Sequence, residues 1–206
     1  MQEPREPEPD CNLCPRLVDY RLENCRSYPD FHNAPVSSFG DIGAELLIVG
    51  LAPGVKGANQ TGRPFTGDYA GDLLYATLLK FGFAHGAYGA RSDDGLSLQN
   101  CRITNAVKCV PPQNKPVGSE VNACRAFLID EIRAMGNLKI LFALGGLAHG
   151  AILSTLGERK SVFWRLRCLL LLLLSEMPFT QAISSKIPLH AHGVGLQGGV
   201  KCKVTT

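Results

Sequence analysis

Four cysteines in two pairs are the residues of this chain whose type and spacing point first to chemistry. Cys11 and Cys14 form a CxxC pair, which lets two thiolates reach one metal centre from a tight turn. Cys109 and Cys124 bound CVPPQNKPVGSEVNAC, where a proline-stiffened loop leads into a predicted helix, so they can converge on the same centre. Four thiolates suit tetrahedral zinc or an iron-sulfur cluster, and spacing alone favours neither. The alternative is that Cys109 and Cys124 are small buried residues without a ligand.

Eight cysteines occur in the 206 residues, and no apolar segment near the start marks an export signal. Clustered cysteines of a reducing compartment bind metal or do chemistry more often than they form disulfides. We therefore predict metal binding by a subset of them in preference to a disulfide framework. Core or bystander roles are expected for the remaining four, Cys25, Cys101, Cys168 and Cys202.

A glycine-rich loop is the second candidate site. Residues 50–68 read GLAPGVKGANQTGRPFTGD, with five glycines, two prolines and one aspartate. Glycine lets a ligand approach the main chain closely, and proline stiffens the chain between such points. The loop lies between an apolar run and an amphipathic run, that is, between a predicted strand and a predicted helix. Ordering such a loop costs entropy, so we expect it to hold a ligand.

The surrounding elements alternate between short apolar strands and helices, which predicts a parallel sheet covered on both faces. The predicted strands span residues 45–53, 101–110 and 139–146, and the helices after them span 68–83, 119–137 and 147–157. The first helix is expected to bury one stripe, formed by Leu73, Leu74, Leu78 and Leu79. The second, capped by Ser119, is expected to turn inward Cys124, Phe127, Leu128 and Ile132.

Length and charge set broad limits. The chain is long enough for one good core and predicts a single domain. Its 21 basic and 18 acidic residues neither demand nor exclude a nucleic-acid partner. Residues 1–10 are rich in proline and glutamate and are expected to form a disordered leader. The apolar stretch at 168–174 is far shorter than the roughly 20 residues of a spanning helix, so we expect no membrane partner.

Several of these motifs together resemble the iron-sulfur uracil-DNA glycosylases. They are CNLCPRL, the GLAPG and FTGD forms of the loop, TNAVKCVPPQNKP and Cys124, in the order and spacing of that family over about residues 10–155. The GLAPG and FTGD forms are most similar to the type 5 branch, to which type 4 is related. The resemblance implies a three-layer α/β/α domain with a short parallel sheet over residues 11–160. It further implies a structural 4Fe-4S cluster on the four paired cysteines.

The resemblance also implies a function. The chain is expected to hydrolyse the N-glycosidic bond of uracil and related deaminated bases in DNA, as a monofunctional enzyme and a monomer. A cytoplasmic location follows, associated with the nucleoid if the source is bacterial. A generic nucleotide-binding protein is disfavoured, because GxxxxGK[ST] and a strand-linked GxGxxG are absent.

Site residues follow from the motif positions. Asp68 is the catalytic candidate, because a carboxylate beside the sugar stabilises the cation that forms there and orients water; it also suits the cap of the next helix. The flipped base is expected to contact the amides near Leu51 and Ala52, the ring of Phe65, and the amides of Asn105 and Asn114. Phe65 as a core residue and Asn114 as a turn residue are the alternatives. The expected phosphate contacts are Arg63, Lys108 and Lys115.

Two departures from the family pattern stand out. Val55 and Lys56 follow Gly54 where many glycosylases have an acid or amide, in keeping with type 5. The second glycosylase motif, a His-containing segment that donates to the departing base, is not found, and His190 and His192 in PLHAHGVG echo only what precedes it. Residues 161–206 are therefore expected to be an atypical, truncated or frame-shifted tail. The alternative function is an impaired iron-sulfur DNA-binding remnant.

Overall fold

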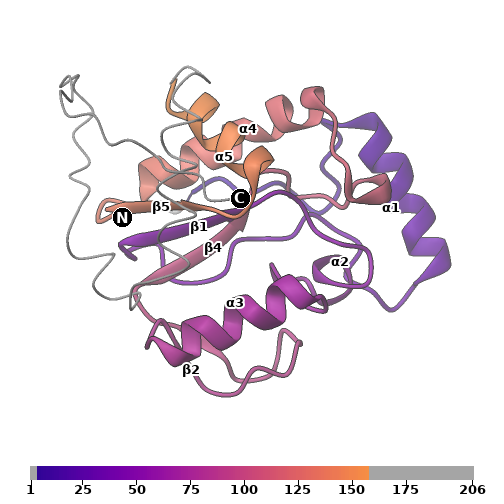
Figure 1. Ribbon diagram of the computed structural model, residues 1–206. Coiled ribbons are helices and arrows are strands. Elements are labelled where there is room, and N and C mark those ends of the chain that lie inside the picture. Colours follow the sequence, from indigo (N-terminus) through magenta and orange to yellow (C-terminus); the bar gives the residue numbers. More distant parts are fainter. Residues whose placement is uncertain (1–3, 158–206) are drawn as a thin grey trace, which may run out of the picture.

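The computed structural model describes residues 4–157 and has a three-stranded parallel sheet at its centre (Figure 1). The middle strand is β1 (Leu46–Gly50), with β4 (Cys101–Asn105) on one side and β5 (Ile140–Ala143) on the other. All five residues of β1 are buried, as expected of a continuous apolar run covered on both faces. The predicted α/β fold with a short parallel sheet is confirmed.

Helices cover the sheet on both faces and make three layers (Figure 1). On one face lie α4 (Gly118–Ala134) and α5 (Gly146–Thr155), and on the other lies α3 (Tyr69–Lys80). The remaining elements are α1 (Pro15–Ser27), the short α2 (Ala58–Thr61), the 3-10 turn η1 (Pro112–Asn114), and β2 (Ala84–His85), which pairs antiparallel with β3 (Ser97–Leu98).

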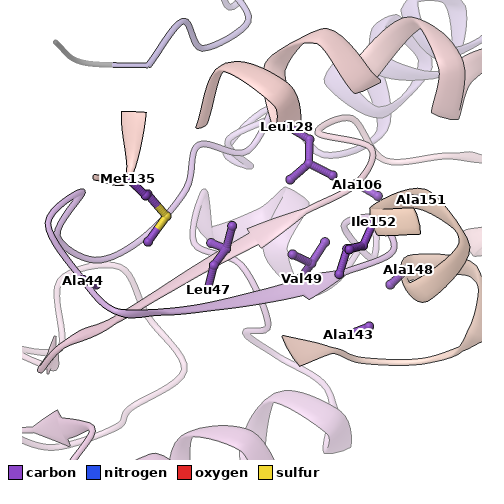
Figure 2. Packing of buried hydrophobic residues seen from close by; sticks show 10 residues of the cluster. All are labelled: Ala44, Leu47, Val49, Ala106, Leu128, Met135, Ala143, Ala148, Ala151 and Ile152. Carbon is purple, nitrogen blue, oxygen red and sulfur yellow. The ribbon is translucent and has the colours of Figure 1, made fainter. Parts of the chain in front are cut away.

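The alternation of side chains along β1 divides the core in two. Leu47 and Val49 pack with residues of α4 and α5, including Leu128 and Ile152, in the cluster that Figure 2 shows. Leu46 and Ile48 belong to the opposite cluster, with Tyr75 and Leu78 of α3. Successive residues of a strand point to opposite faces, so one apolar pentapeptide anchors both helical layers.

Two details of the helices differ from the predictions. Of the predicted stripe on α3, Leu74, Leu78 and Leu79 pack against the core, but Leu73 is 57% exposed, and Tyr75 is buried in addition. Helix α4 is capped one residue before it begins, at Val117, whose amide donates to the Glu120 carboxylate at 2.8 Å. Ser119 is therefore inside the helix and not at its cap.

In the N-terminal segment, for which a disordered leader is predicted, Arg5, Glu6 and Pro7 contact the domain. Arg5 lies 3.2 Å from Asp130 of α4 and sits over the ring of Phe127. Glu6 accepts the Ser38 amide at 3.2 Å and lies 3.3 Å from Lys108 Nζ. Charge pairing thus holds a segment whose composition alone predicts disorder.

The proposed tail at 161–206, with Cys168, His190, His192 and Cys202, lies outside the described residues. No helix between residues 4 and 157 is long and apolar enough to cross a membrane.

Candidate active site and cysteine cavity

The carboxyl ends of β1 and β4 bring two predicted base contacts together. Gly50 ends β1 and pairs in register with Asn105, which ends β4, and the Phe65 ring packs against the same glycine. A Cβ atom at Gly50 would lie 2.6 Å from Phe65 Cε2 and still closer to Asn105 Oδ1. Only glycine fits between the ring and the amide. This edge of a parallel sheet is where ligands bind in open α/β folds.

The Asn105 amide is available for a ligand. Its residue is 3% exposed, and its side chain forms no hydrogen bond with any residue in the range 4–157. An amide offers a donor and an acceptor together, as recognition of a pyrimidine edge requires.

Leu51 and Ala52 continue from Gly50 and join the loop to a different cluster. The Leu51 carbonyl accepts the Val107 amide at 2.9 Å, which extends the pairing of the two chain segments beyond the strands. Ala52 is half-buried and packs against the cluster that contains Cys109 and Cys124. The start of the loop is therefore fixed between the sheet edge and the cysteines.

Asp68 caps α3 and lies close to Phe65. Its Oδ1 accepts the Gly71 amide at 2.8 Å, while the residue remains exposed. Gly71 also packs directly on the Phe65 carbonyl, where a Cβ atom would collide. The capping role expected for Asp68 is present, and through Gly71 the same helix turn sets the position of the carboxylate relative to Phe65.

A cleft of about 600 Å³ lies between α1, the loop and η1. Asp68 and Asn114 line it, whereas Leu51, Ala52, Phe65 and Asn105 do not. The full lining is Tyr20, Glu23, Asn24, Ser27, Tyr28, Gly54, Val55, Lys56, Gly57, Gly67, Asp68, Gln113 and Asn114. Asn114 has φ +56° and lies in the 3-10 turn, so the turn role and the cleft-lining role coincide in one residue.

Arg63 is not placed to contact phosphate, which corrects that prediction. Its side chain is 3% exposed and donates to both carboxylate oxygens of Asp94, at 2.8 and 2.7 Å. This ion pair and the amide donors of Gly89 and Leu96 hold the pKa of the Asp94 carboxyl well below its usual range. The guanidinium is therefore committed inside the protein.

Lys108 is likewise buried, and its predicted phosphate contact does not fit the structure either. The residue is 1% exposed, and its Nζ donates to Ser38 Oγ at 2.6 Å and Thr104 Oγ1 at 2.7 Å. Two carboxylates, of Glu6 and Glu131, lie 3.3 and 3.5 Å from the same nitrogen. The third predicted phosphate contact, Lys115, is exposed next to Asn114.

The four predicted metal ligands meet at one small cavity. Cys11, Cys14, Cys109 and Cys124 all line it, together with Pro7, Leu13, Leu17, Lys108 and Phe127. Between residues 4 and 157, no three His, Cys, Asp or Glu side chains are arranged as ligands of a single metal ion. The shared cavity is thus the observation that joins the two cysteine pairs.

The cavity is an unfavourable place for thiolates alone. Burial raises the pKa of the Cys109 thiol to about 12, and the nearby Cys124, Cys11 and Cys14 add to that rise. Burial also raises the pKa of Cys124, to about 11, although the Lys108 amide donates to its sulfur at 3.4 Å and opposes the rise. Four thiolates at this position need a positively charged group among them.

An ion pair holds the two cysteine segments together. Arg16 lies two residues after Cys14 and donates to both carboxylate oxygens of Glu120, at 2.7 and 2.8 Å. Glu120 lies one helical turn before Cys124 on α4. Arg16 also donates to the Lys115 carbonyl at 3.1 Å. The pair ties α1 to the start of α4 and to the loop that carries Asn114.

Comparison with known proteins decides the family. The profile of the Uracil DNA glycosylase superfamily matches residues 37–188. The chain belongs to this superfamily. A type-5 uracil-DNA glycosylase of Pyrobaculum aerophilum is 39% identical over 158 residues, 75% of this chain and 70% of the relative. The type-5 enzyme of Thermus thermophilus is 41% identical over 156 residues, 73% and 71% of the two chains.

Relatives named type-4 are more distant within the superfamily. The type-4 uracil-DNA glycosylase of Pyrobaculum aerophilum is 33% identical over 141 residues, 67% of this chain and 64% of the relative. The predicted similarity to the type 5 branch above type 4 is confirmed.

Sequence reasoning missed several residues of this glycosylase-like site. Lys56 lines the cleft and is exposed, but it was noted only as a departure from the family pattern. Asp94 and Glu131 were not singled out, because each pairs with a residue 23 to 31 positions away and no local motif marks such a pair. Tyr20 and Glu23 of α1 also line the cleft, and no sequence motif marks them.

Proposed function

We propose that the chain is a monofunctional uracil-DNA glycosylase, which hydrolyses the N-glycosidic bond of uracil and related deaminated bases in DNA. The observation that supports this best is the meeting of Gly50, Phe65 and Asn105 at the sheet edge, beside the helix turn that holds Asp68. Membership of the superfamily and similarity to relatives named type-5 uracil-DNA glycosylase give independent support.

The base is bound after the nucleotide leaves the stack, which costs a few kcal/mol. Phe65 offers its ring face to the base, and the unpaired Asn105 amide reads the edge. Main-chain amides at Leu51 and Ala52 donate to base carbonyls, with Asn114 as a further contact from the cleft wall. The absence of a side chain at Gly50 leaves room for ring and amide to act together.

Bond cleavage builds positive charge on the sugar and negative charge on the base. The Asp68 carboxylate stabilises the sugar cation and orients the attacking water. Its bond from the Gly71 amide uses one oxygen and leaves the other for water or sugar. Lys115, exposed beside Asn114, supplies charge for a neighbouring phosphate.

The four cysteines fit an iron-sulfur cluster. Their thiols line one cavity, and a four-iron cluster spreads its ligands farther apart than one zinc ion does, so a shared cavity without a single-ion site suits it. We propose that Cys11, Cys14, Cys109 and Cys124 hold a 4Fe-4S cluster, which would supply a structural crosslink. Ala52 packs against this cluster of residues, so the cysteines also support the base-binding loop. A monomeric state and a cytoplasmic location stay predictions.

The test is release of free uracil from a single-stranded oligonucleotide, with Asp68→Asn as the matched variant. Asparagine caps a helix as well as aspartate does, so the variant keeps the fold and loses the charge. We expect release by the wild type, and a loss on the order of 100-fold or more in Asp68→Asn at unchanged melting temperature. No release by a wild-type chain that holds its cluster and binds DNA would instead identify a DNA-binding module.

A further inference from the structure

The Arg63–Asp94 ion pair joins the glycine-rich loop to the hairpin of β2 and β3. Two parallel hydrogen bonds link the side chains, which are 3% and 6% exposed. Asp94 also accepts the amides of Gly89 at 2.8 Å and Leu96 at 3.0 Å. Bidentate pairs of this kind fix orientation as well as adding energy. Both ends of the pair are thus rigidly held.

Three aromatic rings enclose the Arg63 guanidinium, those of Phe39, Tyr75 and Tyr88, at 5.2, 5.1 and 5.6 Å from their centroids. Two of the rings also hold the main chain that follows Arg63. Tyr75 donates its hydroxyl to the Pro64 carbonyl at 2.7 Å, and Tyr88 donates to the Phe65 carbonyl at 3.4 Å. The ion pair and the backbone contacts form one unit.

This unit ends at a strained residue. Phe65 has φ +56°, in the left-handed region that non-glycine residues seldom adopt. Such a conformation costs on the order of 1 to 3 kcal/mol and persists only where surrounding contacts determine it. Here those contacts come from Arg63, Tyr75 and Tyr88 on one side and from Gly50 and Gly71 on the other. In this backbone conformation the Phe65 ring lies beside Asn105.

We propose that Arg63 and Asp94 are positioning residues of the active site, which hold the Phe65 ring in its strained orientation over the base. This inference rests on the proposed glycosylase function. Both side chains are buried and bonded to each other, so neither is placed to touch substrate. A purely structural ion pair would lower stability when broken and leave the rate of the folded enzyme unchanged. A positioning pair lowers the rate of the folded enzyme.

Asp94→Asn is the test, with Asp93→Asn as its matched control. Asp93 is the neighbouring acid, 66% exposed and paired only with Arg91 within the described chain. Both variants are assayed for uracil release at a temperature where each is fully folded. We expect kcat of Asp94→Asn to fall on the order of 100-fold while KM for DNA changes by less than about threefold. Asp93→Asn should match the wild type, and Arg63→Lys, which keeps the charge without the fork, should lie between.

A second readout does not depend on activity. With 4-fluorophenylalanine placed at position 65, the fluorine resonance should move in Asp94→Asn and stay in place in Asp93→Asn. Folded Asp94→Asn with wild-type kcat, or with an unmoved resonance, would overturn the positioning role. If the wild type releases no uracil, the proposed function fails, and the resonance alone still decides whether the pair positions Phe65.

Discussion

Gly50 gives the sharpest test of the proposed base pocket, because its missing side chain is what allows Phe65 and Asn105 to meet. In Gly50→Ala the new Cβ atom would lie 2.6 Å from Phe65 Cε2, against an ordinary contact of 3.4 Å or more. The ring and the Asn105 amide must therefore both move, each by about 0.8 Å or more. A displacement near 1 Å in a catalytic site costs on the order of 100-fold in rate, and overpacking costs about 1 to 3 kcal/mol of stability.

The assay is single-turnover uracil release together with urea unfolding, with Gly54→Ala as the comparison. Gly54 is in the same GLAPG motif, but the nearest atom to a Cβ there is Asn114 Oδ1 at 3.9 Å, so alanine fits. We expect the free energy of unfolding of Gly54→Ala to stay within about 0.5 kcal/mol of wild type. A folded Gly50→Ala variant with wild-type rate would refute the assignment of Phe65 and Asn105 to the base pocket.

Three further outcomes follow, two from buried charges and one from the cysteines. The pKa of Asp94 is lower in the folded protein than its unfolded value of about 4, so the ionised carboxylate stabilises the fold above about pH 4. This stabilisation is lost as the pH falls below about 4. In Asp94→Asn, the free energy of unfolding should therefore depend less on pH in the acid range. Glu6 is, after Glu131, the second carboxylate beside Lys108 and Arg102. Glu6→Gln should therefore lower the free energy of unfolding by about 1 to 2 kcal/mol. As a control, Glu8→Gln at an exposed position should change the melting temperature little. On the proposed 4Fe-4S cluster, Cys109→Ser should abolish the visible absorbance of the purified protein, and Cys25→Ser, exposed on α1, should keep it.

The sheet could be predicted because its strands are continuous apolar runs, and their order along the chain alternates with helices. The residues at which strands end could not be predicted in the same way. We predicted a strand over residues 101–110, but β4 ends at Asn105, where the chain turns toward the cysteine cavity. The hairpin of β2 and β3 was missed because each strand has only two residues and no pattern can emerge over that length.

Site residues could be predicted where one stretch of sequence indicates both the position of a side chain in the fold and its chemical role. Asp68 combines a cap position with a carboxylate, and both are visible in the order of residues around it. The predicted phosphate contacts of Arg63 and Lys108 were wrong for the opposite reason. A basic residue in a ligand loop suggests phosphate, but its partner lies in a segment far along the chain, and only the folded structure shows that the charge is already neutralised.

Because Arg63 and Lys108 are buried in ion pairs, DNA phosphates must be bound by other residues. The charged residues that line the cleft are Glu23, Lys56 and Asp68, two carboxylates against one amine. Such a surface is a poor phosphate site, since nucleic-acid backbones require an excess of positive charge. It suits the sugar, because a reaction that builds a cation there is helped by neighbouring negative charge. On the proposed function, the cleft interior therefore serves the reacting nucleotide, and the flanking phosphates lie at its rim, where Lys115 is exposed.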